Sequence, residues 1–175
     1  MVSLAVVFVA TSAMAAHRNN NGATCRAANL NQAFELGWDH ARVYNPGTRD
    51  LWVICPLPYS LDADWQSGSA SIFPLDDYYR DNTINVYAWF GASAAPAAQV
   101  TCIVREMATS TTDTAAANAV SQVIAQSGGG VPEVVSQTFD ATSFGPGTLT
   151  ATCKLPPGTG INAVTFTGIT YVNSF

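Results

Sequence analysis

The amino-acid sequence predicts an all-β fold: a single antiparallel β-sandwich, of plain or jelly-roll type, with two disulfides. Two observations predict it. Apolar β-branched and aromatic residues alternate with polar residues in at least seven short segments, and residues typical of turns separate these segments. Four cysteines in a chain with no long helical pattern agree with a small disulfide-linked β domain.

The strand pattern recurs along the whole chain, and most segments end at Pro, Gly or Asn. The expected strands are 38–44, 51–55, 84–90, 100–104, 134–139, 149–155 and 163–172. In the last of them we expect a β-bulge at Gly168, because an interior glycine often marks one. Residues 115–125 fit a short helix, an exposed loop or an added strand at 120–124.

Composition excludes one broad class of function. The chain has 175 residues, enough for one domain with its own core. Charged residues are only 11%, where soluble domains average about 25%, and the net charge is -5. Only seven Lys and Arg are present, scattered along the chain. Since a phosphate backbone is bound by clustered cations, nucleic acid is not an expected partner.

The N-terminus predicts export. Residues 2–16 carry no charge and are too few to span a bilayer, which takes about 20 apolar residues. The segment ends in Ala13-Met14-Ala15, the small-x-small pattern of a signal-peptidase site. We therefore predict a signal peptide at 1–15 and no transmembrane helix. The expected location is secreted, extracellular or cell-surface, with the periplasm as a further option.

Two further segments complete this domain organisation. Residues 16–24 are polar, and we expect a flexible tail there before a β-sandwich at 25–175. An alternative keeps the N-terminal segment, because 4–9 (LAVVFV) is also a strong strand former. Such a retained apolar strand could insert into the open sheet edge of a neighbouring subunit.

The cysteines agree with an exported protein. None of Cys25, Cys55, Cys102 and Cys153 lies in a Cys-x-x-Cys pair, which disfavours zinc and thioredoxin-type sites. An even number in an exported chain indicates two disulfides, for which three connectivities exist. We favour Cys25–Cys55 and Cys102–Cys153, because sequential pairing is the simplest in a hairpin-rich fold.

Three cysteine-containing segments carry a resemblance. An early Cys25, the V-x-C-P-L-P segment at 53–58 and the T-C-x-L-P-P-G segment at 152–158 resemble a group of exported bacterial proteins of unassigned function. The resemblance implies a small β-sandwich outside the cytoplasm. It implies no catalytic residues, because none are established for the group.

The sequence offers little for catalysis. Its two histidines are His17, in the expected tail, and His40, which we place on the surface of a strand. No Gly-x-Ser-x-Gly motif is present to position a nucleophilic serine. We therefore predict that the protein is not an enzyme.

A stretch at 59–82 combines carboxylates with aromatic rings. It holds the weak calcium candidates Asp62, Asp64, Asp76 and Asp77, the aromatics Trp65, Tyr78 and Tyr79, and in addition Asp81 and Phe73. The favoured interpretation is a solvated loop with Asp at turn positions. The alternatives are a calcium site, a sugar-binding loop, or the paired carboxylates of a hydrolase. Calcium is thus the only cofactor considered, and otherwise none is expected.

A second aromatic candidate lies on the strand at 84–90. Tyr87 and Trp89 are two residues apart, so both side chains point to the same face. This pair could stack on sugar rings, pack against another subunit, or belong to the core. Trp38 and Trp52 are expected in the core.

Together these features predict an exported, non-catalytic structural or surface protein. It would act by self-association or by contact with another exported surface protein. The alternative is a carbohydrate- or ligand-binding module that uses the exposed aromatics, with a polysaccharide as partner. A secreted hydrolase using the loop aspartates is the remote third hypothesis.

Overall fold

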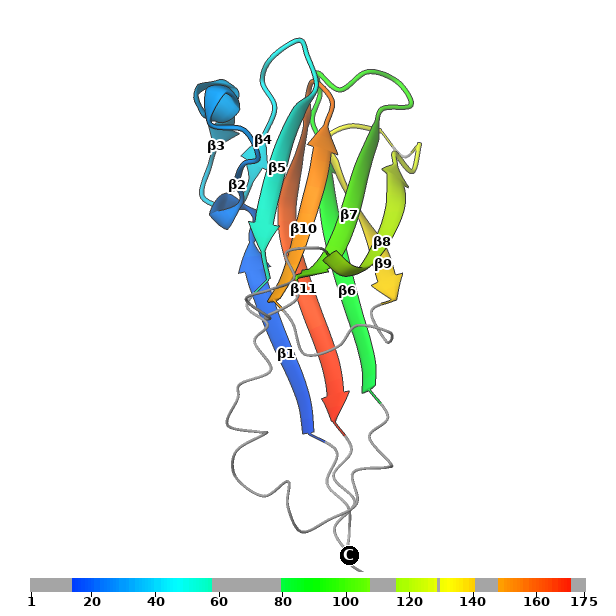
Figure 1. Cartoon of the computed structure of the whole chain (residues 1–175). Helices are drawn as coiled ribbons and strands as arrows, with labels where there is room; N and C mark the ends of the chain where they lie inside the picture. Colours follow the sequence, from blue (N-terminus) through cyan, green and yellow to red (C-terminus); the bar gives the residue numbers. More distant parts are fainter. Residues whose placement is uncertain (1–13, 58–79, 108–115, 129, 141–147, 171–175) are drawn as a thin grey trace, which may run out of the picture.

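A computed structural model describes residues 14–57, 80–107, 116–128, 130–140 and 148–170, and it confirms the two-layer all-β fold (Figure 1). Within these ranges it has eleven strands and two short 3-10 helices, η1 (Gly22–Thr24) and η2 (Leu30–Glu35). The strands are β1 (Met14–Asn21), β2 (Arg26–Ala27), β3 (Gly37–Trp38), β4 (Val43–Tyr44), β5 (Leu51–Pro56), β6 (Arg80–Phe90), β7 (Gln99–Met107), β8 (Ala116–Ala125), β9 (Glu133–Asp140), β10 (Thr148–Leu155) and β11 (Thr159–Thr170). In the described part of the chain, no helix is long and apolar enough to cross a membrane.

The strand order is that of a jelly roll. Sheet A has the order β3-β4-β11-β6-β9, with β1 also paired to β11, and sheet B has the order β2-β5-β10-β7-β8. Every pairing is antiparallel. Strands β4 to β7 pair in reverse order with β8 to β11, so the chain forms one long hairpin. Rolling that hairpin up adds the contacts of β11 with β6 and of β10 with β7, which is the double Greek key of a jelly roll.

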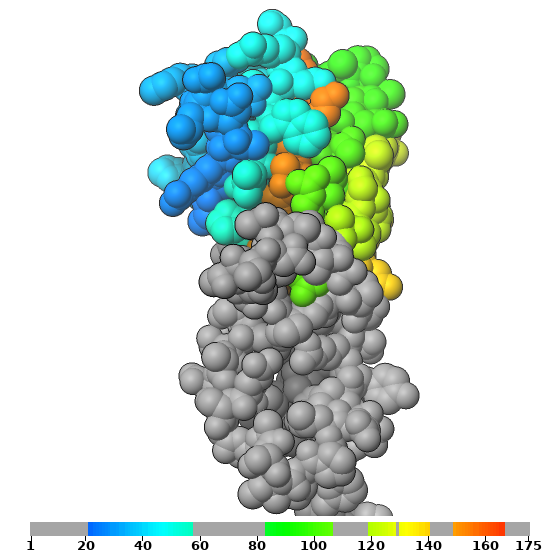
Figure 2. Space-filling model, viewed as in Figure 1, coloured from blue at the N-terminus to red at the C-terminus, as the bar shows by residue number. Residues whose placement is uncertain are grey.

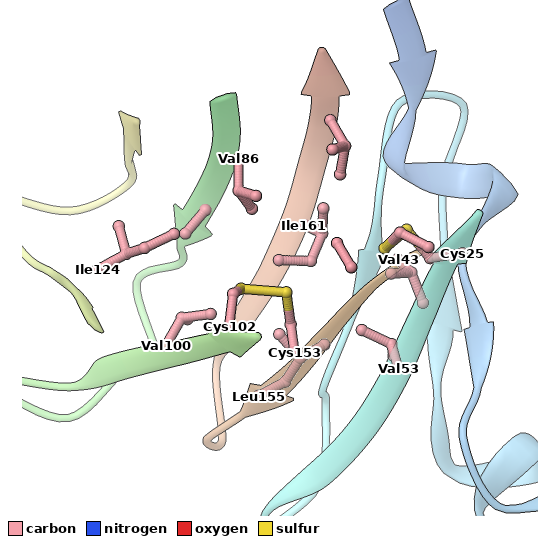
Figure 3. Packing of buried hydrophobic residues seen from close by; sticks show 14 of the residues in the cluster. Cys25, Val43, Val53, Val86, Val100, Cys102, Ile124, Cys153, Leu155 and Ile161 are labelled. Carbon is pink, nitrogen blue, oxygen red and sulfur yellow. A yellow bond between two sulfur atoms is a disulfide. The ribbon is translucent and has the colours of Figure 1, made fainter. Parts of the chain in front are cut away.

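The core lies between the two sheets. In β5 and β6 the buried residues alternate with more exposed ones, as the period-2 pattern predicts. The largest fully buried side chains are Phe90, Phe139, Leu51, Ile84, Ile124, Leu149, Leu155 and Ile161. Figure 3 shows this packing around the Cys102–Cys153 disulfide.

Both predicted disulfides are confirmed. Cys25, at the end of η1, is bonded to Cys55 of β5. Cys102 of β7 and Cys153 of β10 are direct partners across neighbouring strands and are bonded to each other. All four side chains are at most 2% exposed, so the disulfides belong to the core.

Several local expectations were wrong. The expected strand at 38–44 is a tight β3–β4 hairpin, because the Asp39 carboxylate accepts backbone hydrogen bonds from Ala41 and Arg42 and turns the chain. Residues 115–125 hold the long strand β8 (Ala116–Ala125), so the expectations of a helix or a loop fail there and the strand alternative is extended.

The irregularity in β11 is also not where we expected it. The register of β11 against β6 is regular at Gly168 and shifts instead between Ile161 and Ala163. Residues 16–24, expected to be a flexible tail, belong to β1 and η1. Their backbone runs antiparallel to β11 from Ala16↔Gly168 to Asn21↔Ala163.

The two tryptophans assigned to the core lie elsewhere. Trp38 is 46% exposed, because it belongs to β3, the two-residue edge strand of sheet A. Trp52 is half-buried on the outer face of sheet B, since its neighbours Leu51 and Val53 take the inward positions. For both residues the aromatic character was a poor guide, and the position on the strand decided the burial.

Candidate interaction surfaces

The outer face of sheet A carries an aromatic pair, Tyr44 and Trp89, that meets over a glycine. Gly160 of β11 is the direct partner of Tyr44 on β4 and of Trp89 on β6. Strands two apart in a sheet are separated by about 9–10 Å, yet the two ring centroids are 5.9 Å apart, edge to face at 70°. The rings can lean together because the residue between them has no side chain.

The space over Gly160 is closed to any larger residue. A Cβ atom there would lie 2.4 Å from the Val43 carbonyl oxygen and 2.9 Å from the Tyr44 Cβ. Gly91 has the same relation to Trp89, since a Cβ there would lie 2.3 Å from the indole ring. Glycines thus let the aromatic rings lie against the sheet.

Charged groups next to Trp89 are paired within the chain. The Arg42 guanidinium lies over the indole, 4.6 Å from the ring centroid, and its Nε is 2.7 Å from the Asp39 carboxylate. The backbone hydrogen bond from Ala41, together with that from Arg42 and the Arg42 charge, holds the pKa of Asp39 below its ordinary value. This arrangement fixes the β3–β4 hairpin against Trp89 and leaves the indole half-buried.

Only part of the predicted ligand site can be placed. Tyr87 and Trp89 lie on the outer face of sheet A, and both are half-buried, so neither belongs to the core between the sheets. The other ligand and calcium candidates lie outside the described residues, namely Trp65, Tyr78, Tyr79, Asp62, Asp64, Asp76 and Asp77.

Among the residues that the structure describes, no cluster of three His, Cys, Asp or Glu could hold a metal ion. His40 is exposed, in the β3–β4 turn rather than on a strand.

A second surface is an apolar projection on η2, formed by Leu30 and Phe34. The side chains are 85% and 97% exposed, the two highest values among the large hydrophobic residues described. Trp38, on the neighbouring strand β3, is 46% exposed. Sequence reasoning missed this surface, although two apolar residues four apart in the polar stretch 29–35 were a visible signal.

The backbone beneath the projection is held in place by polar contacts. The Asn29 side chain accepts a hydrogen bond from the Asn31 backbone at 3.0 Å and so caps η2. The Gln32 side chain accepts one from the Trp52 backbone at 3.3 Å, which ties η2 to sheet B. Glu35 forms an ion pair with Arg49. The exposure of Leu30 and Phe34 is therefore a property of an anchored segment.

A third feature is a shallow hollow of about 240 Å³ where the turn between β6 and β7 meets the connection from β8 to β9. Its apolar wall is formed by Ala94, Pro96 and Val131, and Val131 is itself 41% exposed.

No protein-family model, curated protein sequence or solved structure matches this chain. The functional argument therefore rests on the surfaces described above.

Proposed function

We propose that this protein is an exported, non-catalytic structural or surface protein that acts by self-association. The observation that carries the proposal is the apolar projection of Leu30 and Phe34, anchored on η2 and almost fully exposed. Burying a side chain of this size is worth about 1.5–3 kcal/mol, so leaving two in water favours a contact that covers them.

The rest of the chain supports this role. Two buried disulfides are typical of proteins that work outside the reducing cytoplasm, and the resemblance to exported bacterial β-sandwich proteins favours the same location. Few charged residues, 11% of the chain, mean that few charges must be desolvated when two copies come together.

Sedimentation velocity of the unreduced full chain over a wide concentration range tests the proposal. We expect the average mass to rise with concentration, and the double variant Leu30→Ser/Phe34→Ser to remain monomeric. Val123→Ser is the matched control, because Val123 is 48% exposed on the outer face of sheet B, away from η2. A wild-type chain that stays monomeric throughout contradicts self-association.

One observation favours a second function, polysaccharide binding. Tyr87 and Trp89 lie two residues apart on the outer face of sheet A, and the glycines beside Trp89 leave room for a flat aromatic surface. Aromatic faces of this kind stack on the apolar faces of sugar rings. Because Arg42 already lies over the indole, a sugar would have to use the Tyr87 side of the pair.

Affinity electrophoresis in gels that contain soluble polysaccharides tests this second function. Tyr87→Ala and Trp89→Ala should each weaken retention roughly tenfold, which corresponds to about 1.4 kcal/mol. Trp38→Ala is the control, since it removes an exposed indole from the edge of the same sheet. Equal retention of all variants, or none by the wild type, would argue against a sugar-binding role.

A further inference from the structure

Strand β1 lies at the edge of sheet A and has one neighbour. Among the strands that the structure describes, it pairs only with β11, from Met14↔Thr170 to Asn21↔Ala163. Its sequence, MAAHRNNN, has no β-branched residue and ends in three asparagines, a residue type that is depleted in strands. The facing half of β11, AVTFTGIT at 163–170, is mostly β-branched. The weaker strand former of this pair is therefore the one at the edge.

The chain is fixed by a covalent bond just after β1. Helix η1 follows β1 at once, and Cys25 at the end of η1 is bonded to Cys55 of β5. Segments near a chain terminus that make few contacts open locally at a low cost in free energy. An opening that begins at β1 meets the disulfide at Cys25, which keeps the next residues on sheet B. Strand β1 can thus leave β11 while the rest of the sandwich stays folded.

The three residues of η1 form a closed hinge. Gly22 lies so close to β11 that a Cβ atom there would be 1.9 Å from the Ile161 carbonyl oxygen. The Asn21 side chain accepts a hydrogen bond from the Ala23 backbone at 2.8 Å and donates one to the His40 carbonyl at 2.8 Å. These contacts hold β1 in line with its own β11. Because glycine adopts backbone angles that other residues avoid, Gly22 also allows the hinge to open.

A β11 edge that has lost β1 needs a new partner. The unpaired N–H and C=O groups of such an edge are a template for pairing with another strand. A second copy of β1 is the segment whose fit to this edge is already visible, since the register within one chain can be repeated between two chains. Exchange of an identical element between copies is also a low-cost route to dimers. The expected occupant of the edge is therefore β1 of a second copy.

The β1 edge and the apolar projection lie on the same side of the molecule. Helix η1 contacts β11, β4 and β5, and η2 follows a few residues later beside β2. Figure 1 shows β1 and both helices in blue on the left, and Figure 2 shows the described residues from 21 onward on the upper part of that side. An opened η1 spans only about 10 Å, so two copies must already touch here before β1 can cross. A contact through Leu30 and Phe34 meets that condition.

We propose that two copies of the chain exchange β1, so that β1 of each copy pairs with β11 of the other in the register found within one chain. The inference rests on the proposed self-association, which brings the copies together through the projection, and it adds the contact that then holds them. Reciprocal exchange covers both β11 edges, whereas one-way exchange leaves one edge open. The product is therefore a closed dimer. Because its separation requires both strands to detach, this dimer should persist after dilution.

Two single-cysteine variants test the exchange. His17 and Thr167 are direct partners in the β1–β11 pair, so cysteines at these positions lie within reach of a disulfide. Chains with His17→Cys and chains with Thr167→Cys are mixed at a concentration where the wild type self-associates, incubated and oxidised gently. Neither chain can form this bond alone. We expect a covalent heterodimer in non-reducing electrophoresis, with a link between positions 17 and 167 in peptide mass spectrometry.

Controls separate exchange from random collision. Val123→Cys replaces Thr167→Cys in the matched control, because Val123 is 48% exposed on the outer face of sheet B, and the heterodimer should then be lost. Asn21→Ala, added to both cysteine variants, removes the two side-chain hydrogen bonds of the hinge and should speed up heterodimer formation. Asn31→Ala, at an exposed asparagine outside the hinge, should leave the rate unchanged.

A chain that carries both His17→Cys and Thr167→Cys gives a second measurement. Oxidation of this chain in dilute solution locks β1 onto its own β11. The locked chain should still associate reversibly through the projection, but it should form no dimer that survives dilution in sedimentation velocity. Near-ultraviolet circular dichroism checks that each variant is folded.

The outcomes distinguish this inference from the proposed function. If the mixed variants give no more heterodimer than the Val123→Cys control while the wild type self-associates, β1 stays on its own chain, and the exchange is wrong although self-association stands. If the locked chain forms the same dilution-resistant dimer as the wild type, a contact other than β1 holds that dimer, and the exchange is again wrong. A wild-type chain that never associates overturns the proposed function together with this inference.

Discussion

Gln122 of β8 donates a hydrogen bond from its side-chain Nε2 to the backbone carbonyl of Thr138 on β9, at 2.8 Å, and so links the edges of the two sheets. Gln137 of β9 donates to the Gln122 side chain in return. Unpaired edge strands are templates for pairing with another chain. The hydrogen bond from Gln122 occupies one backbone acceptor of β9, so this part of the edge is less open to pairing with another chain.

The first prediction concerns this link. Gln122→Ala removes the donor to Thr138 and should lower the free energy of unfolding by about 1 kcal/mol, the usual net value of a hydrogen bond. Urea unfolding followed by fluorescence measures the change. Ser121→Ala, on the exposed outer face of the same strand, is the control and should behave like the wild type. Equal stability of the two variants would show that the link does not stabilise the fold.

The second prediction concerns the glycine between the aromatic rings. Gly160→Ala places a Cβ 2.4 Å from the Val43 carbonyl oxygen, so the backbone of β4 or β11 must move. Crowding of this kind typically costs about 1–3 kcal/mol, so we expect the free energy of unfolding to fall by an amount near the upper end of that range, and the tryptophan fluorescence to change. Gly47→Ala is the milder control, since its nearest neighbour is a side-chain oxygen at 3.2 Å. A Gly160→Ala protein as stable as the control would contradict the close approach of β4 and β11.

The fold was largely predictable from the sequence because strand periodicity is a local signal. In β6 the alternation correctly placed Ile84, Val86, Ala88 and Phe90 on one face and Tyr87 and Trp89 on the other, but it left open which of the two faces belongs to the core. The predicted disulfide pairing was also correct, although its reason was not, because Cys102 and Cys153 lie on β7 and β10, which are not joined by a hairpin. The jelly-roll order did not follow in detail, because the contacts of β11 with β6 and β4 join residues far apart in the chain.

The candidate surfaces were less predictable, for two physical reasons. The Tyr44–Trp89 contact depends on Gly160, which lies between them on the neighbouring strand. No pattern in the local sequence indicates which residue will lie opposite on a neighbouring strand. The exposure of Phe34 depends on which segments of the chain pack against η2. That packing is a property of the whole fold and not of the local sequence. Trp38 shows the same limit, because its aromatic character suggested the core and its edge position left it in solvent.

The third prediction concerns the disulfides. All four cysteines are at most 2% exposed, and attack by an external thiolate requires access to sulfur. Reduction by dithiothreitol in native buffer should therefore be limited by opening of the sandwich and should speed up sharply in urea. Mass spectrometry after alkylation counts the reduced cysteines at each time. Rapid reduction of both disulfides in native buffer would mean that the sandwich opens easily around them.

Removal of the second disulfide gives the fourth prediction. Replacing both Cys102 and Cys153 by alanine opens a loop that spans 51 residues, and on the chain-entropy account this costs about 4 kcal/mol of stability. The strands β7 and β10 still pair in the variant, so the native fold should persist at low temperature with a lower Tm. Differential scanning calorimetry of the variant and the wild type compares the two. An unchanged Tm would indicate that the unfolded chain is already compact around this pair.

The last prediction follows from the charge at the β3–β4 hairpin. Hydrogen bonds from the Ala41 and Arg42 backbone, with the Arg42 charge, lower the pKa of Asp39 from its ordinary value of 3.8. A carboxyl whose pKa is lower in the folded state stabilises that state above its ordinary pKa, and this contribution is lost as the pH falls through the lower value. Between neutral pH and about pH 4 the hairpin should thus keep its stability, and it should weaken in more acidic solution.

Asp39→Asn isolates the charge in this experiment. The asparagine oxygen can still accept from the Ala41 and Arg42 backbone, but it has no proton to gain and no charge to hold Arg42 over Trp89. We expect the total tryptophan fluorescence of the wild type to change below about pH 4 with the titration of Asp39, and we expect the variant to lack the part of this change that comes from Trp89. If both proteins show the same acid transition, another carboxyl group controls the hairpin, and the Asp39–Arg42 pair has no part in positioning the indole.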